Sequence, residues 1–240
     1  MQIHNRLDQG VSGSGKTTLG AALAKALSLP FIDADDLHSE ANKAKMARSE
    51  PLTDADRAPW LVCVRRAAIK AVEYNARGVV VACSALKATY RQVLRGERAN
   101  LNPDAHSRGD ACGEATVTAG DENPDRGQQA EEWRREPEGQ LGTDKGIMEG
   151  ASLPRQGDWA QGARTVFVHP YGARAVLMER MTSRKSHFMK VDMLASQMEI
   201  LENPCLTGES GIIEIRLEAS VEEQVRAAVE GLALALMGLR

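Results

Sequence analysis

The sequence predicts an α/β fold, in which an open and mostly parallel sheet of five strands carries helices on both faces. Three observations lead to this prediction. Apolar strand-like runs alternate with helical segments, a glycine-rich loop over residues 10–17 precedes the first helix, and residues 79–83 are apolar throughout. A continuous apolar run is typical of a central parallel strand that helices cover on both sides. The 240 residues are enough for a single α/β domain, taken here as residues 1–240.

Residues 1–35 are predicted to supply two strands and one helix. Residues 1–9 should form the first strand, but IHNRLDQ is polar for a central strand. Either this strand is short and irregular, or the amino terminus is not the natural one. Apolar and small residues recur at helical spacing over residues 17–27, which predicts the first helix. Residues 31–35 are predicted as the second strand.

Two capping signals mark later helices. Thr53 and Asp56 fit the pattern [ST]-x-x-[DE], which predicts a helix that tolerates Pro59 in its first turn and stops near Gly78. Ser220 and Glu223 give the same signal before a final helix with an apolar face. The remaining elements are predicted as a strand at 79–83, a helix through 90–94 that Gly96 closes, a strand at 165–169, a helix through 176–181 and a strand at 212–217.

The glycine-rich loop is the strongest functional signal. Residues 10–17 read GVSGSGKT and match the phosphate-binding pattern G-x-x-x-x-G-K-[ST] at every fixed position. Such a loop lets backbone N–H groups converge on a polyphosphate at the amino end of a helix. A chance glycine-rich turn is the alternative, and the helical pattern that follows argues against it. The predicted nucleotide contacts are Gly10, Val11, Ser12, Gly13, Ser14, Gly15, Lys16, Thr17 and Thr18, with Lys16 on the β- and γ-phosphates and the Thr17 hydroxyl as a Mg²⁺ ligand.

Composition excludes several other classes of protein. Aromatic residues make up 4% of the chain and the net charge is −3, which argues against a nucleic-acid-binding surface. No signal peptide and no apolar stretch near the ~20 residues of a membrane span is present. The four cysteines lack paired spacing, and Cys83 is predicted to be a buried small hydrophobe. We expect a soluble cytoplasmic protein without nucleic-acid or membrane partners.

Residues 99–163 depart from the alternating pattern. This stretch holds 13 acidic and six basic side chains and only eight large apolar ones. Such a segment buries too little apolar surface to offset the entropy of ordering. It is therefore predicted to be a flexible acidic insertion that the chemistry does not need.

Asp33 and Asp35 are the candidate carboxylates for phosphoryl transfer. Two residues apart on a predicted strand, they should project to the same side at its carboxyl end. A phosphotransferase needs one carboxylate near Mg²⁺ and one that orients or deprotonates the acceptor hydroxyl. We assign Asp33 to the metal and Asp35 to the acceptor. The alternative is an Asp-rich turn that caps the next helix.

Further motifs resemble the small P-loop gluconokinases, relatives of shikimate and adenylate kinases. The resemblance covers residues 10–95 and 164–240. It rests on GVSGSGKT, FIDADDLH (31–38), PLTDADRAPWL (51–61), CSALKATYR (83–91) and RKSHFMKVDMLASQ (184–197). It implies a P-loop kinase fold like that of nucleoside-monophosphate kinases, a homodimer, and transfer of the ATP γ-phosphate to the 6-hydroxyl of D-gluconate for the pentose phosphate pathway. It also implies a lid at residues 182–190, in which Ser186 replaces a usual glycine.

The acceptor site should offer cations for a carboxylate and hydrogen-bonding groups for several hydroxyls. Arg57 and Arg91 suit a carboxylate best, because guanidinium engages it bidentately. Arg180 and Arg184, about one helical turn apart, should approach the transferred phosphate. The alternatives are that Lys45 and Arg91 are solvated or salt-bridged surface residues, that His38 caps a helix and that His187 packs in the lid. The predicted substrate contacts are Asp35, His38, Lys45, Arg57, Ser84, Lys87, Arg91 and His187.

Three functions remain open at the level of sequence. The first is ATP-dependent phosphorylation of gluconate. The second is phosphorylation of another small hydroxy acid such as shikimate, because acceptor choice depends on few side chains. The third is a nucleotide-binding regulatory module without catalysis. Lys16, Thr17, Asp33 and Asp35 together argue against the third.

Overall fold

The structure is a computed structural model that describes residues 4–8, 14–75, 77–98, 101, 117–118, 164–183 and 191–238. Most of the segment 99–163, the loop 9–13 and residues 184–190 of the expected lid lie outside the described residues. The elements, in chain order, are β1 (His4–Asp8), α1 (Lys16–Leu27), β2 (Phe31–Asp33), the 3-10 turn η1 (Ala34–Leu37), α2 (Glu40–Ala47), α3 (Asp54–Asn75), β3 (Gly78–Ala82), α4 (Ala88–Arg95), β4 (Val117–Thr118), β5 (Arg164–Tyr171), α6 (Arg174–Ser183), α7 (Val191–Ile200), β6 (Ile212–Arg216) and α8 (Val221–Leu236).

One mostly parallel sheet organises the described residues. Its strand order is β4-β2-β3-β1-β5-β6, and every neighbouring pair is parallel except β2 with β4. The five predicted strands are therefore present. The two-residue strand β4 was not predicted, and it lies inside the segment 99–163 expected to be flexible.

The polar first strand is regular despite its composition. β1 lies in the middle of the sheet and pairs in register with β3 on one side and β5 on the other. It is short, as one of the two expectations had it, but it is not irregular. Backbone hydrogen bonds to strands on both sides hold this segment in the centre of the sheet. Side-chain hydropathy alone did not indicate a central strand here.

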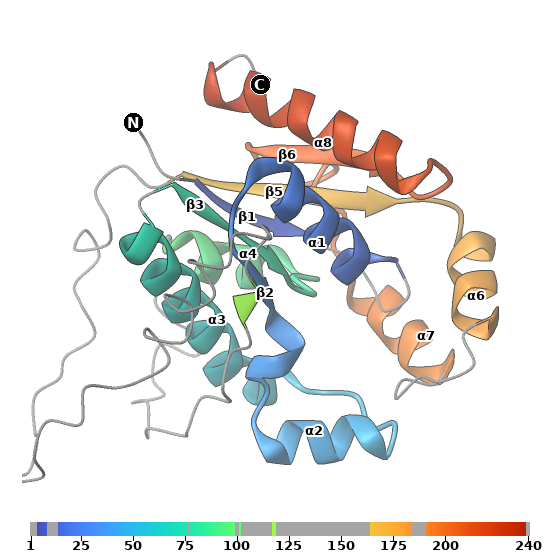
Figure 1. Ribbon diagram of the computed structural model, residues 1–240. Helices are drawn as coiled ribbons and strands as arrows, with labels where there is room; N and C mark the ends of the chain where they lie inside the picture. The colour runs from blue at the N-terminus through green and yellow to red at the C-terminus, as the bar shows by residue number, and fades with distance from the viewer. Residues whose placement is uncertain are drawn as a thin grey trace, which may run out of the picture.

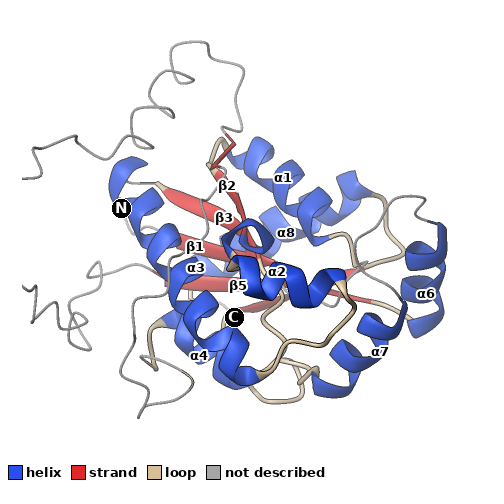
Figure 2. Ribbon diagram, turned by 90° about the horizontal axis from the view of Figure 1, so that it is seen from below, coloured by secondary structure: helices blue, strands red, loops and turns tan. Residues whose placement is uncertain are grey.

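Helices cover both faces of the sheet (Figure 1). Alternate residues of β3 point to opposite sides, so Val79 and Val81 pack with side chains of α3 and α4, whereas Val80 and Ala82 pack with α1 and α8. This alternation is the period of two that a strand imposes. Figure 2 shows α6 and α7 side by side at one end of the sheet, beside the carboxyl end of β5. Cys83 is buried in the first of these cores, as expected.

Both predicted capping signals are present. Ser220 and Glu223 form a reciprocal capping box at the start of α8. At the start of α3 the Thr53 hydroxyl accepts the N–H of Asp56 at 3.2 Å, and an Asp56 carboxylate oxygen accepts the Thr53 N–H at 2.9 Å. Pro59 was predicted in the first turn of this helix. It lies beyond the first turn of α3, so that prediction was wrong by one turn. Gly96 ends α4 with φ at 82°, a left-handed conformation that favours glycine.

The second strand is shorter than predicted. β2 ends at Asp33, and Asp35 lies in the turn η1 rather than on the strand. The Asp33 carboxylate accepts the N–H of Asp35 at 3.0 Å and so caps this turn. The capping role that was the alternative for the Asp-rich segment is therefore real for Asp33. Among the described helices, none is both long and apolar enough to cross a membrane.

A buried ion pair fixes α4 against the segment that precedes β6. Arg91 has no exposed surface, and its Nε lies 3.0 and 2.9 Å from the two carboxylate oxygens of Glu209. Its Nη1 donates to the carbonyls of Ala85 and Leu86. Arg95 also donates to Glu209 at 3.3 Å. One guanidinium thus braces both the loop before α4 and the chain before β6.

We predict that Glu209→Ala lowers the free energy of unfolding by about 3 kcal/mol, because it leaves the Arg91 charge buried without its anion. Urea denaturation measures the change. The matched control is Glu40→Ala, since Glu40 forms an exposed pair with Lys43 and its removal should cost less than about 1 kcal/mol. Equal losses in the two variants would contradict the structural role given to Glu209.

Candidate active site

The described end of the phosphate loop leads directly into α1. Gly15 is the N-cap of α1 with φ at 85°, and a Cβ built on it would lie 3.6 Å from an Nη atom of Arg180. Ser14 is buried, and within the described part of the chain its hydroxyl has no hydrogen-bond partner. The first turn of α1 carries Lys16, Thr17 and Thr18. The amino end of α1 thus lies beside a guanidinium, and both features favour an anion.

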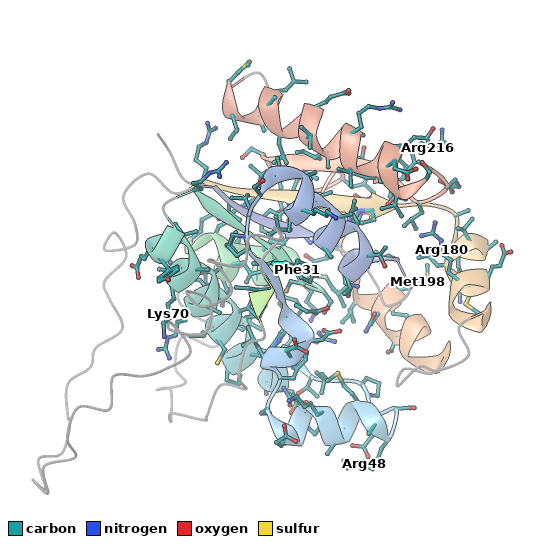
Figure 3. All side chains as sticks on the ribbon, viewed as in Figure 1. Phe31, Arg48, Lys70, Arg180, Met198 and Arg216 are labelled. Carbon is teal, nitrogen blue, oxygen red and sulfur yellow. The ribbon has the colours of Figure 1, made fainter. Side chains whose placement is uncertain are left out.

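Arg180 reaches this loop from the far side of the site. Figure 3 shows it on the side of α6 that faces α1. One of its Nη atoms donates to the carbonyl of Leu217, which holds the guanidinium in place. The other lies beside Gly15. The structure therefore brings Arg180 to the predicted phosphate site, whereas Gly10, Val11, Ser12, Gly13, Arg184 and His187 lie outside the described residues.

Asp33 joins the phosphate loop to the turn η1. Its Oδ2 accepts the Thr17 hydroxyl at 2.8 Å, while its Oδ1 accepts the Asp35 N–H. A hydroxyl and a carboxylate oxygen in contact are the hard donors that Mg²⁺ prefers. No cluster of three or more His, Cys, Asp or Glu side chains with metal-site geometry occurs in the described ranges. A metal here would thus take few protein ligands, as is usual for Mg²⁺ bound together with substrate phosphates.

The carboxylate of Asp35 lies within the electrostatic influence of a cation of the phosphate loop, Lys16, and of a cation of α3, Arg57. Its residue is exposed, but protein atoms surround the carboxylate, and this desolvation raises its pKa above the ordinary value. The charge of Asp33 adds to the rise, and the charges of Lys16 and Arg57 oppose it. A carboxylate with a raised pKa accepts a proton more readily than an ordinary one. Asp35 is thus chemically suited to deprotonate a hydroxyl, although it lies in a turn and not on the strand.

Arg57 is buried without a carboxylate partner in the described structure. It is 4% exposed, and its Nε makes no hydrogen bond. Its guanidinium carbon lies 5.9 Å from the ring centre of Tyr90. A buried charge with unmade hydrogen bonds is costly, so such a group marks a place for an anion. The observation supports Arg57 as a ligand for a substrate carboxylate.

The other acceptor-site cations already have acidic partners. Lys45 donates to Asp56 at 2.6 Å, and Lys87 donates to both oxygens of Asp54 at 2.8 Å. The hydroxyl of Tyr90 also donates to Asp54. These hydrogen bonds, from Lys87 first and then Tyr90, lower the pKa of Asp54. Asp54, Asp56 and Tyr90 were not predicted as site residues, although all three lie within motifs 51–61 and 83–91, two of those that carry the family resemblance.

Arg91 does not belong with these candidates, and its predicted role as a carboxylate ligand is corrected. Its guanidinium is neutralised by Glu209 and by two backbone carbonyls, as described above. Such an arrangement leaves it no capacity for a substrate anion. Ser84 lies buried in the loop that Arg91 braces. Sequence alone did not separate Arg91 from Arg57, because Glu209 follows it by more than a hundred residues.

His38 is a buried side chain at the end of the turn η1. It is 2% exposed and stacks on Trp60 with 4.3 Å between ring centroids and 11° between planes. Its backbone N–H bonds to the carbonyl of Asp35. Burial, and after it the positive charges of Arg57 and Lys43, lower its pKa to about 3. His38 is therefore uncharged at neutral pH, and it is not the cap of α2, a position that Ser39 fills.

Comparison with known proteins gives a consistent set of relatives. The family model for shikimate kinase matches residues 12–101. A probable gluconokinase of Mus musculus is 33% identical over 226 residues, which cover 94% of this chain and 96% of the relative. The thermosensitive gluconokinase of Escherichia coli is 32% identical over 92% of this chain and 84% of its own. The crystal structure of a gluconokinase from Sinorhizobium meliloti aligns with a TM-score of 0.63 at 30% identity, covering 98% of this chain and 95% of that one.

We predict that His38 makes the folded protein sensitive to acid. Below about pH 6.5 the unfolded chain takes up a proton on this ring, whereas the folded chain stays neutral until about pH 3. Stability is therefore lost as the pH falls through this window. The free energy of unfolding should decrease in both proteins between about pH 7 and pH 4.5. The decrease should be smaller in His38→Gln, by roughly 1–3 kcal/mol, because glutamine does not take up a proton. Urea denaturation at both pH values tests this, and parallel losses in the two proteins would contradict it.

Proposed function

The chain belongs to the gluconokinase family, and we propose that it transfers the γ-phosphoryl group of ATP to the 6-hydroxyl of D-gluconate. The products are ADP and 6-phospho-D-gluconate, which feeds the pentose phosphate pathway. The observation that carries the proposal is that the Asp35 carboxylate lies within the electrostatic influence of two cations, Lys16 and Arg57. Lys16 belongs to the phosphate loop, and Arg57 is a buried guanidinium that lacks a carboxylate partner in the described structure. Each reacting group thus has a proposed partner: Lys16 for the phosphate, Asp35 for the hydroxyl and Arg57 for the carboxylate.

The proposed step is an in-line displacement at the γ-phosphorus. The acceptor oxygen forms a bond to phosphorus, the bond from phosphorus to the bridging oxygen of ADP breaks, and the hydroxyl proton passes to the Asp35 carboxylate. Lys16 and Arg180 stabilise negative charge that develops on the phosphoryl oxygens. Because the Leu217 carbonyl holds Arg180 before substrate arrives, this guanidinium needs little reorganisation during the reaction.

Mg²⁺ is expected between Thr17, Asp33 and the phosphates of ATP. When bound, it would neutralise charge on the β- and γ-phosphates. Thr17 and Asp33 are in contact through a 2.8 Å hydrogen bond, so a hydroxyl and a carboxylate oxygen lie close together. The Asp33 carboxylate also accepts the backbone N–H of Asp35. It therefore links the proposed metal position to the residue that is proposed to contact the acceptor hydroxyl.

The acceptor site is proposed to select one carboxylate and several hydroxyls. Arg57 would hold the carboxylate, and His38, Ser84, Lys45 and Lys87 would contact hydroxyl oxygens. Lys45 and Lys87 support hydroxyl binding better than carboxylate binding, because Asp56 and Asp54 already balance their charges. Arg184 and His187 remain candidates for lid contacts with phosphate and substrate. A homodimer, which light scattering would measure, and a cytoplasmic location complete the proposal.

An ADP-release assay over a panel of acceptors tests the function. The panel contains D-gluconate, glucose, shikimate and other sugar acids, and Lys16→Ala supplies the inactive reference. We expect turnover with gluconate and little or none with glucose or shikimate. Preferential turnover of shikimate would favour the alternative function, since a shikimate kinase model also matches residues 12–101. Absence of turnover with every acceptor would favour a regulatory role.

We predict that Asp35→Asn lowers kcat by roughly 10²-fold or more, because an amide cannot accept the hydroxyl proton. The KM for ATP should change little. Steady-state kinetics with each substrate varied in turn measure both effects. A variant that keeps kcat and raises the KM for ATP would instead assign Asp35 to the metal side.

We predict that Arg57→Leu weakens gluconate binding by roughly 10²-fold or more and reduces the preference for gluconate over glucose, since a charge-assisted pair is lost. Arg57→Lys should recover part of that preference. The control is Arg66→Leu, an exposed position on the same helix, α3. If Arg57→Leu keeps the full preference for gluconate over glucose, the carboxylate binds elsewhere, with Lys45 or Lys87 as the next candidates.

A further inference from the structure

Asn42 makes two side-chain contacts that determine how its amide is oriented. It lies in the first turn of α2, and its Nδ2 is 2.9 Å from the backbone carbonyl oxygen of Asp56. A carbonyl only accepts hydrogen bonds, so the atom that faces it must be the amide nitrogen. The contact therefore fixes which end of the amide is NH₂, a choice that geometry alone leaves open.

The same nitrogen meets the ring of His38. Nδ2 of Asn42 lies 3.4 Å from Nδ1 of His38. An amide NH₂ group only donates, so Nδ1 must act as the acceptor and carry no proton. A neutral imidazole has one proton, which then resides on Nε2. In the described part of the chain no hydrogen bond engages that Nε2.

We propose that Asn42 is a positioning residue for acceptor binding: it holds His38 as the Nε2–H tautomer, which donates a hydrogen bond to a hydroxyl oxygen of the acceptor. The inference deepens the proposed function and rests on it for the identity of the acceptor. Donation by His38 leaves the acceptor hydroxyl free to give its own proton elsewhere. A fixed donor thus complements the proton-accepting carboxylate of Asp35.

The surroundings of His38 hold the ring plane as well as its tautomer. Trp60 stacks on one face of the ring, and its own Nε1 donates to the carbonyl of Ala34 at 2.7 Å. The backbone N–H of His38 bonds to Asp35. A donor held by a stack, a backbone bond and an amide loses little freedom when substrate binds, so its hydrogen bond contributes fully to affinity.

Nitrogen-15 NMR of the purified full-length protein reads the tautomer directly, without substrate. The expected spectrum shows His38 protonated on Nε2 in the unmutated protein. In Asn42→Asp the new carboxylate accepts instead of donating, so the proton should move to Nδ1 or the ring should become charged. A His38 ring protonated on Nδ1 in the unmutated protein would overturn the proposal, whatever the substrate proves to be.

Kinetics test the consequence for binding. Asn42→Leu and Asn42→Asp should raise the KM for gluconate roughly tenfold and leave the KM for ATP nearly unchanged. The control is Ser39→Ala, which removes the N-cap of α2 and so weakens the same helix without touching the His38 ring. If Ser39→Ala raises the gluconate KM as much as the Asn42 variants do, Asn42 has only a structural role and the proposal fails.

A pair of substitutions at His38 supplies an independent comparison. The amide nitrogen of glutamine reaches about as far from the backbone as Nε2, whereas that of asparagine reaches only as far as Nδ1. His38→Gln should therefore show a gluconate KM several-fold lower than His38→Asn. The reverse order would overturn the proposal. Absence of gluconate turnover in the unmutated protein would refute the proposed function alone, since the NMR result would stand.

Discussion

The carboxylate of Asp33 connects the two halves of the site. One of its oxygens takes the hydroxyl of Thr17 at the start of α1, and the other takes the backbone N–H of Asp35 in η1. Parallel strands bring these segments to the same edge of the sheet, but packing alone does not set a carboxylate within reach of a phosphate. The Asp33 contacts do so, because they tie the phosphate loop and the acceptor turn to a single side chain. This connection places Asp35. It also places His38, because the backbone N–H of His38 bonds to the carbonyl of Asp35.

Charge pairing distinguishes the cations on the proposed acceptor side from one another. Three cations gather around Asp54, Asp56 and Tyr90, yet two of them are balanced by aspartates. In the described structure Arg57 alone among these three makes no ion pair, and it is the most buried of them. A site with one uncompensated buried cation favours a ligand with one negative charge, since either a neutral or a doubly charged ligand leaves a charge unmatched. The two lysine pairs orient groups that can still contact hydroxyl oxygens.

Much of this arrangement could be predicted from the sequence because it is local. The phosphate loop, both capping boxes and the alternating elements depend on residues a few positions apart. The prediction failed where a contact is long-range or where backbone pairing outweighs hydropathy. β1 lies in the centre of the sheet because β3 and β5 both pair with it. β2 ends earlier than predicted because Asp33 caps η1. β4 and the role of Asn42 likewise depend on partners that no local pattern reveals.

Arg57 and Arg91 show why residue type and motif are not enough to assign a binding role. Both are buried arginines within motifs of the same family resemblance, and both lie on helices that flank the acceptor site. Burial of a guanidinium has to be compensated, and the compensation reveals the role. Glu209 compensates Arg91 within the fold, so Arg91 acts by bracing the loop that carries Ser84. Arg57 has no such carboxylate in the described structure, and this difference is the basis for proposing it as the ligand of a substrate carboxylate. The partner of a buried charge, more than its depth, therefore separates residues that hold the site from residues that bind substrate.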